Sequence, residues 1–361
     1  MISSILIMFV VLFSLTALII IHELGHFLLA KKFGVKVEEF GLFLPPRIWG
    51  KKIGDTIYSI NWLPLGGFVK LLGEEGGVSS DQGNFNAKPV WQRMLIIVGG
   101  VLSFWIIAWV LLTFVFMTGS VMQIDDSQNV ANPHVQIIEV MSNSPAADAG
   151  LQSGDIIKGV ALHSNPENIT AIETVSAVQN FTSAHQGEAV IFKVLRSGKE
   201  ISLTLTPRIN PPAGEGAVGI ALVRLGTINY PWWQAPLIAA KTVGNYTISV
   251  FTGWYTIIND YVHNKSLPAG AEIVGPIGML QLMDQAAYHG VSYYLQLIAL
   301  IAVYLAVFNA LPIPALDGGK LMFLAIEAIR RKPVPVQIEQ TITAVFMFAL
   351  LILMLLVTVG D

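Results

Sequence analysis

Three ionisable residues near the start of the chain have the types and the spacing of a metal site. His22 and His26 are four residues apart, and Glu23 lies between them. On a helix, side chains four residues apart lie on one face, so both imidazoles can bind one Zn²⁺ while Glu23 acts as general base. The triplet ends an apolar run from Ile5 to Leu29, where each ionisable group costs roughly 2.5–3.5 kcal/mol. A metal site therefore explains these residues better than chance.

Asp317 is the best candidate for a third zinc ligand. Catalytic zinc typically has three protein ligands and keeps a fourth position for water. The chain has no Cys, so the missing ligand must be a carboxylate or a His. Asp317 follows an apolar stretch in which Pro312 and Pro314 must break the helix, and irregular backbone at membrane depth is tolerated only against protein or a water-lined cavity. Because a carboxylate at that depth is costly, we favour metal binding over a simple helix N-cap.

The composition is that of a protein with several membrane spans. Charged residues make up 12% of the 361 residues and apolar residues 53%, and this charged share is about half that of a soluble domain. The net charge of -3 gives no indication of nucleic-acid binding. The first apolar run has no basic residue before Lys31 and exceeds the length of a signal-peptide core, so we interpret it as a retained span. Four stretches are long and apolar enough to cross a lipid bilayer, namely 4–29, 94–118, 293–311 and 339–359.

Basic residues predict how these spans are oriented. Lys and Arg number nine in the 64 residues of 30–93 but eight in the 172 residues of 119–290. By the positive-inside rule, 30–93 and the basic segment after the third span are cytoplasmic, so the chain starts and ends outside. The first-span histidines then lie within the membrane near its cytoplasmic side. The other histidines fall in the external segment, where solvation or packing is their simpler role: His134, His163, His185, His263 and His289.

The predicted fold is a multispanning α-helical membrane protein with four transmembrane helices, an inserted α+β domain and a membrane-associated β-hairpin. An additional crossing at 232–262 is disfavoured, because it would put the end of the third span outside, away from the first-span histidines; we expect an amphipathic helix on the outer surface instead. In order, the predicted segments are the first transmembrane helix (1–29), a cytoplasmic loop (30–93) with the hairpin (about 54–73), the second transmembrane helix (94–118), the inserted domain (124–207), a linker with interfacial amphipathic helices (208–290), the third transmembrane helix with the Asp317 motif (291–319), a cytoplasmic loop (320–338) and the fourth transmembrane helix (339–359).

The predicted hairpin lies close to the metal site along the chain. Thr56–Ile60 and Phe68–Leu72 are short β-type runs, joined through Pro64 and Gly66-Gly67. The segment is unusually apolar for a cytoplasmic loop, so we expect it to dip into the membrane beside the metal. An exposed strand edge at Gly66 and Gly67 would bind an extended substrate by strand pairing. The alternative is an ordinary interfacial hairpin.

The inserted domain contains a recognisable signature. Ser144–Ile157, of sequence SPAADAGLQSGDII, resembles the PDZ signature SPA..AGL..GD.I. A PDZ fold offers a groove that binds a chain end by strand addition, but such a domain on a membrane enzyme can equally act as a sieve, which we favour. The remaining elements predicted in this domain are a strand at Val135–Val140, a helix at Thr170–Phe181, and a hairpin of Ala189–Leu195 and Glu200–Thr206 across Ser197-Gly198, followed by a linker from Pro207 to Gly216.

The two metal-ligand segments together resemble the site-two protease family of intramembrane zinc metalloproteases, in particular its bacterial sigma-E-regulating branch. His22-Glu23-Leu24-Gly25-His26 lies in the first span and Asn309–Gly319 in the third, as in that family. Further segments share the likeness: Pro64–Lys70, Trp91-Gln92-Arg93, the PDZ signature and Gly275–Gly278.

Two departures from the family pattern stand out. The family's second span usually carries GPxxN, whereas this chain has Gly100-Val101-Leu102-Ser103-Phe104 in that register. We expect this change to loosen a helix contact or a substrate path and to touch no proposed ligand. The chain also has room for a single PDZ domain, whereas enterobacterial members carry two in tandem.

The resemblance implies a substrate class, a site and a location. It implies an endopeptidase of the bacterial inner membrane that hydrolyses transmembrane segments of single-span proteins, commonly anti-sigma factors or remnant signal peptides, after a first external cut. His22, His26 and Asp317 would hold Zn²⁺, Glu23 would be the general base, and Asn309 resembles a residue that contacts the substrate backbone. The competing interpretations are a non-catalytic PDZ-bearing scaffold or transporter, which predicts no zinc, and a metalloprotease that cuts loops outside the bilayer.

Overall fold

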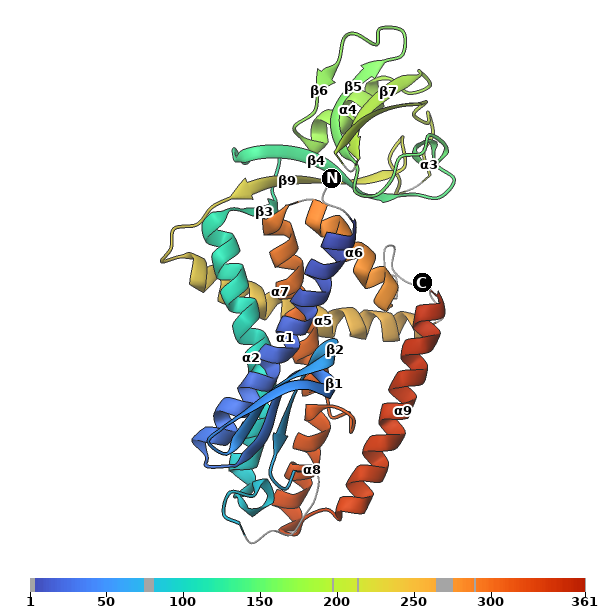
Figure 1. The fold of residues 1–361 in the computed structure, drawn as a ribbon. Helices are drawn as coiled ribbons and strands as arrows, with labels where there is room; N and C mark the ends of the chain where they lie inside the picture. Colours follow the sequence, from blue (N-terminus) through green and yellow to red (C-terminus); the bar gives the residue numbers. More distant parts are fainter. Residues whose placement is uncertain are drawn as a thin grey trace. The chain divides into compact units, whose positions relative to one another are not determined.

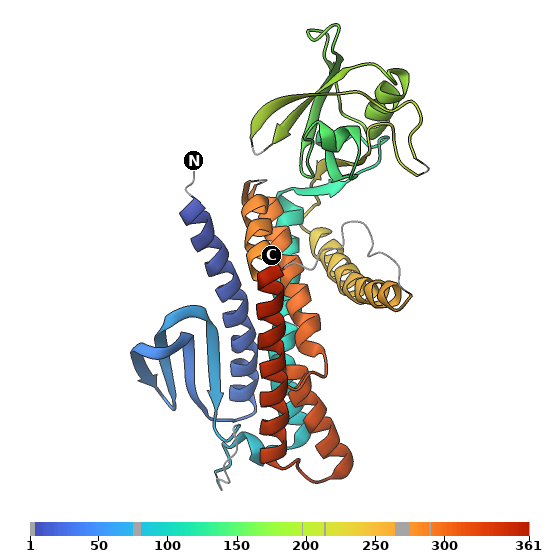
Figure 2. The same ribbon diagram turned by 90° about the vertical axis from the view of Figure 1, so that its right-hand side faces the viewer.

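The computed structural model describes residues 4–74, 81–196, 198–212, 214–263, 275–288 and 290–360. The chain forms two compact units, one from Met1–Phe114 together with Trp233–Asp361 and the other from Val115–Trp232. The first unit holds the long apolar helices and a small sheet, and the second holds a larger sheet (Figures 1 and 2).

Four helices are long and apolar enough to cross a membrane, in the part of the chain that the structure describes. They match the four predicted spans, and each of them starts within about four residues of the predicted position. Their surfaces expose large apolar side chains, such as Phe13 and Leu356, and this exposure suits lipid rather than water. The four are α1 (Ser4–Lys32), α2 (Val90–Thr118), α7 (Val291–Ala310) and α9 (Val336–Gly360).

Two further helices of the first unit precede α7, namely α5 (Ala235–Val262) and α6 (Pro276–Tyr288). The helix predicted over 232–262 is thus present as α5. Exposed apolar side chains recur on it at Ile248, Phe251 and Tyr255, with the three- and four-residue spacing of one helix face. This pattern is typical of an amphipathic helix, and the placement of α5 at a membrane surface stays a prediction.

The chain leaves helical structure after α7, and six residues separate α7 from the helix α8 (Asp317–Arg330). Pro312 and Pro314 lie in this break, where they were predicted to end the helix. The prediction of a loop over 320–338 is wrong for its first part, because α8 continues to Arg330. Phe323 and Leu324 are buried on this helix, so an apolar face stabilises it against the rest of the unit.

The small sheet is formed by β1 (Val37–Ile53) and β2 (Thr56–Leu71), which pair with each other. The hairpin predicted within 54–73 is wrong, because its two β-type runs belong to the single strand β2. Each run pairs with β1 and not with the other run: Leu42 has Gly67 as one partner and Ile60 as another. The turn that joins the paired strands is therefore at 54–55.

A buried apolar cluster fixes this sheet to the helices that carry the candidate site. It joins the end of α1, the beginning of α2, the ends of the two strands, the short 3-10 helix η1 (Phe85–Ala87) and α8. Both views show β1 and β2 beside the lower half of α1 (Figures 1 and 2). The cluster consists of Ala30, Val35, Val37, Leu71, Phe85, Ile96, Ile97 and Leu324.

The second unit is built on a sheet with the strand order β3-β9-β4-β5-β7-β8, in which β6 also pairs with β5. The predicted strand at 135–140 and the predicted 189–206 hairpin are confirmed, although Ser197 lies outside the described residues. The helix predicted over 170–181 begins only at Val175, because Thr170–Ala171 pairs with β5 and Thr174 caps the helix. The elements are β3 (Ser120–Gln123), β4 (Ala131–Val140), α3 (Pro145–Asp148), β5 (Ile156–Leu162), β6 (Thr170–Ala171), α4 (Val175–Ala184), β7 (Val190–Arg196), β8 (Lys199–Leu205) and β9 (Ile220–Ile228).

The boundaries predicted for this insert, 124–207, are too narrow. The strand β9 lies in the segment predicted as a linker, and it pairs with both β3 and β4. The segment 207–216 is therefore a connection within the sheet unit. Ser144 caps α3, and the buried Asp155 binds Arg196 of β7, so two polar residues of the SPAADAGLQSGDII segment hold its loops in place.

Candidate active site

Helix α1 presents His22, Glu23 and His26 from neighbouring positions, as the four-residue spacing predicts. Both histidines are buried, with exposed fractions of 8% and 6%. Helix α2 lies directly behind them, because a Cβ atom on Gly25 would lie 2.3 Å from the carbonyl oxygen of Gly99. Glycine at both positions thus permits a close approach of the two helix backbones.

Gly100 of α2 packs closely against the imidazole of His26. A Cβ atom built on Gly100 would lie 2.1 Å from His26 Nε2 and 2.2 Å from Cε1 of the same ring. A side chain of any size would therefore displace His26. The Nδ1 atom of His26 lies 3.0 Å from the carbonyl oxygen of Ile96, so α2 also supplies the group that orients this ring.

Asp317 reaches the histidines because the chain folds back sharply between α7 and α8. Cβ atoms on Gly318 and Gly319 would lie 1.9 Å from Leu311 O and 2.3 Å from Ile313 O. Only glycine fits this close approach of backbone to backbone. As a result, Asp317 Oδ2 lies 3.2 Å from Nε2 of each histidine. Asp317 follows His26 by 291 residues in the sequence.

The three converging atoms fit a tetrahedral metal ion. His22 Nε2 and His26 Nε2 are also 3.2 Å apart, so the three atoms form a nearly equilateral triangle. Two ligand atoms on a tetrahedral Zn²⁺ at about 2.0–2.1 Å are about 3.3 Å apart. When His26 Nδ1 donates to Ile96 O, its Nε2 carries a lone pair that points at a carboxylate, and a cation resolves this repulsion. Within the described residues, His22, His26 and Asp317 are the group of this kind.

His22 is held by an aromatic contact. The ring of Phe104 stacks on it with centroids 4.7 Å apart and an angle of 15° between the planes. Phe104 occupies the position of the Asn in the family's GPxxN pattern. We expected the departure from that pattern to touch no proposed ligand. This expectation is wrong, because the sequence does not reveal which face of α2 points at α1.

Glu23 lies between α1 and the strand β2. Its Oε2 atom accepts a hydrogen bond of 3.1 Å from the backbone N–H of Val69. Farther up α1, the hydroxyl of Thr16 donates to the carbonyl oxygen of Pro64 at 3.1 Å. These two bonds fasten β2 along the helix face that carries the carboxylate, so strand and candidate base are positioned together.

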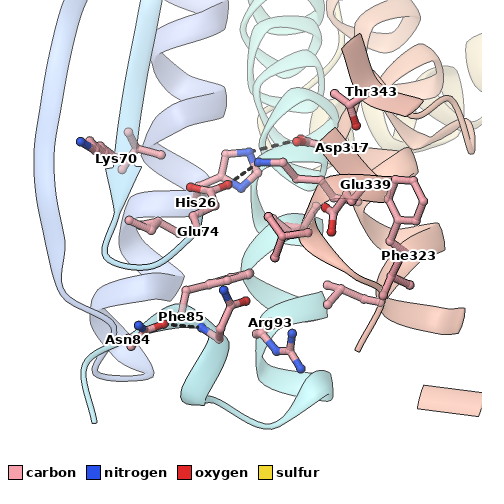
Figure 3. Close-up of a pocket in the computed structure, with 18 of the residues that line it drawn as sticks. His26, Lys70, Glu74, Asn84, Phe85, Arg93, Asp317, Phe323, Glu339 and Thr343 are labelled. Carbon is pink, nitrogen blue, oxygen red and sulfur yellow. Dashed lines mark hydrogen bonds and ion pairs between the residues drawn. The ribbon is translucent and has the colours of Figure 1, made fainter. Parts of the chain in front are cut away.

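A cavity of about 1300 Å³ opens onto these residues, and its lining comes from α1, β2, α2, α8 and α9. Figure 3 shows His26 beside Asp317, with Glu74, Arg93 and Glu339 around the same space. The charged side chains in this lining suit water access to a site in an otherwise apolar unit. The charged side chains of the lining are Glu23, Lys70, Glu74, Arg93, Asp317, Lys320, Glu327 and Glu339.

The other predicted site residues are placed differently. Gly66 and Gly67 lie against α1, where a Cβ on Gly67 would be 3.3 Å from Ile20 and 3.9 Å from Glu23. Asn309 instead donates a hydrogen bond of 2.9 Å to Leu305 O of its own helix, and it is not among the residues that line the cavity. Lys320 and Glu74, which line the cavity, were not among the predicted site residues. The position of Lys320 three residues after Asp317 was the available signal.

Comparisons with known proteins agree with this geometry. The profile described as Peptidase family M50 matches residues 10–353. A Clostridium perfringens protein named as a predicted zinc metalloprotease is 33% identical over 97% of this chain and 96% of its own length. The zinc metalloprotease RasP of Geobacillus kaustophilus is 27% identical, over 99% of this chain and 97% of its own. The regulator of sigma-W protease RasP of Bacillus subtilis is also 27% identical, over 98% and 97%.

The fold and the comparisons together define a zinc metalloprotease that is a membrane protein. A scaffold or transporter without catalytic activity is therefore set aside. The chain belongs to Peptidase family M50, the family of the site-two proteases, as its sequence motifs predicted.

Proposed function

We propose that this protein is an intramembrane endopeptidase that cleaves the transmembrane segments of single-span proteins. The observation that carries the proposal is the convergence of His22, His26 and Asp317 on one point, beside Glu23, inside a unit whose helices are long and apolar enough to cross a membrane. A protease site at that position acts on peptide bonds that reach it from within the bilayer. Loops outside the bilayer are the competing substrate class.

The proposed chemistry is hydrolysis with one acid–base residue. Zn²⁺ held by His22, His26 and Asp317 would activate a water molecule and polarise the scissile carbonyl. Glu23 accepts the proton of the attacking water and then donates it to the leaving amine nitrogen. The attack forms a C–O bond, and the C–N bond then breaks, so one water is consumed for each peptide bond cleaved. The cavity lined by charged side chains would admit that water.

The edge of β2 is the proposed binding site for the substrate backbone. The N–H of Val69 points to Glu23 and not to β1, and residues two apart in a strand point the same way, so the backbone groups of Gly67 share that direction. An unwound substrate segment that pairs with this edge lies next to the candidate base. This supports a substrate-binding role for Gly66 and Gly67. Asn309 must release its hydrogen bond to Leu305 O before its side chain can contact a substrate backbone.

The inserted sheet unit and the membrane orientation complete the proposal. We assign Val115–Trp232 as an extracytoplasmic PDZ-type domain that acts as a sieve, supported by its SPAADAGLQSGDII segment and by strands on either side of it. The basic segments near α1 and α8 support a site close to the cytoplasmic side of a bacterial inner membrane. Because the Bacillus subtilis relative is named a regulator of a sigma factor, anti-sigma factors and remnant signal peptides are the proposed substrates.

Replacement of Glu23 by Gln tests the proposal. The reporter is a tagged single-span protein with a short external tail, reconstituted with the full-length enzyme in proteoliposomes. Wild type should cleave the reporter within its span, and Glu23→Gln should abolish cleavage with zinc content unchanged. Glu188→Gln, which changes an exposed carboxylate, should behave as wild type.

Two results would contradict the proposal. If the Glu23→Gln variant still cleaved the reporter, Glu23 would not be the general base. A cut mapped by mass spectrometry to the tail or another segment outside the span would favour the loop-cutting alternative. A second reporter with a bulky folded external domain tests the sieve, because this reporter should be cleaved slowly until that domain is removed.

A further inference from the structure

Two ion pairs attach α8, the helix that begins with Asp317, to its neighbours. Arg93 of α2 binds Glu327, and both side chains are largely buried, with exposed fractions of 8% and 16%. Lys320, one turn after Asp317, binds Glu74, which lies three residues beyond the end of β2. The first pair holds α8 to a helix, and the second holds it to the strand proposed to bind substrate.

The Lys320–Glu74 pair joins the two parts whose separation matters for cleavage. Lys320 follows the metal-ligand carboxylate on the same helix turn, and both members of the pair line the 1300 Å³ cavity. Glu74 follows the strand whose Val69 N–H binds Glu23. A substrate paired with β2 is therefore tied through Glu74 and Lys320 to the helix that presents Asp317.

We propose that Lys320 and Glu74 are positioning residues that fix the register between the substrate strand and the metal site, an inference that rests on the proposed function. Successive residues of a strand are about 3.3 Å apart. A shift of β2 against α8 by that distance brings a neighbouring peptide bond of the substrate to the site. The pair thereby selects which bond is cut, without touching the reacting atoms.

A purely structural role does not account for this pair. The buried Arg93–Glu327 pair and the apolar cluster that includes Leu324 already fasten α8. Lys320 is 44% exposed and Glu74 is 19% exposed, and ion pairs that water reaches contribute little to folding stability. The pair can therefore set the distance between the end of β2 and α8 while contributing little to folding stability.

The test uses the full-length enzyme in proteoliposomes and the single-span reporter that wild type cleaves. Lys320→Gln and Glu74→Gln should each spread the cut over adjacent peptide bonds and raise KM about three- to tenfold, the size of effect expected for one partly exposed ion pair. The exchanged variant Glu74→Lys with Lys320→Glu should restore the single cut. Zinc content and Tm should stay at wild-type values in all three.

Lys36→Gln is the matched control. Lys36 forms an ion pair of similar exposure with Asp81, 48% and 35%, near the same sheet but outside the cavity lining. This variant should keep the wild-type cut and KM. An unchanged cut and KM in the Lys320 and Glu74 variants would overturn the proposal, and so would a loss of zinc or a lowered Tm, which indicates a structural role. Failure of the proposed function is distinguishable, because it appears as cleavage by Glu23→Gln.

Discussion

Replacing Gly100 by Ala should weaken zinc binding more than it disturbs the fold. The added Cβ would lie 2.1 Å from His26 Nε2, whereas ordinary van der Waals contact begins near 3.4 Å, so the ring must withdraw by about 1.3 Å. Changes to the groups that surround and orient a metal-ligand histidine typically cost about 10- to 100-fold in metal affinity. We therefore expect a zinc Kd raised by that factor and proteolysis reduced in proportion at limiting zinc.

Competition with a chelating dye measures the zinc Kd, and thermal unfolding measures the fold. Gly244→Ala on α5 is the matched control, because a Cβ there meets no atom within 4 Å. In a helix interior, Gly→Ala without a clash stabilises by about 0.5–1 kcal/mol, so Gly244→Ala should keep the wild-type Kd and raise Tm slightly. A wild-type zinc Kd in Gly100→Ala would refute the inference that α2 forms the wall behind His26.

Three further predictions concern other contacts. Phe104→Leu keeps an apolar side chain but removes the ring that stacks on His22, so a loss of about 0.5–1.5 kcal/mol should appear as a two- to tenfold higher zinc Kd with little change in Tm; an unchanged Kd would show that the stacking is dispensable. Arg93→Gln leaves Glu327 buried without its partner, and should lower the free energy of unfolding by about 3–5 kcal/mol in a denaturant titration; a change under 1 kcal/mol would contradict this. Burial alone would raise the pKa of Asp126, but the backbone N–H groups of Ser176 and Val175 outweigh it and lower the pKa; the second unit should thus keep this stability above the unfolded pKa, about 3.9, and lose it as the pH falls through the folded pKa. Hydrogen exchange of 115–232 against pH would show that loss in wild type and a weaker one in Asp126→Asn, and equal pH dependence in both would count against the assignment.

The sequence pointed to the three residues that converge in the structure because the patterns that mark them are local. The spacing of His22 and His26, the carboxylate after two prolines and the lengths of the apolar runs all depend on neighbours in sequence. The β1 strand was not predicted, since Pro45-Pro46 and several charged residues interrupt its alternation. Strand β9 was not predicted, because it follows a proline-rich segment that indicated a linker. Both strands form through pairing partners that a local pattern does not contain.

The sequence did not predict the contacts between segments that lie far apart in the chain. Arg93 and Glu327 are 234 residues apart, and Glu74 and Lys320 are 246 apart. Charged residues outside apolar runs are usually solvated, so the sequence did not indicate that these four form pairs with one another. The stacking of Phe104 on His22 depends on the rotation of α2 about its axis, which hydropathy does not set in a helix that is apolar on all sides.

The proposed zinc site consists of two histidines of α1 and the carboxylate that begins α8. An anomalous difference map collected at the zinc absorption edge from crystals of the full-length protein tests this most directly. We expect a single strong peak between His22 Nε2, His26 Nε2 and Asp317 Oδ2. A peak at any other group of side chains, with none at this one, would contradict it.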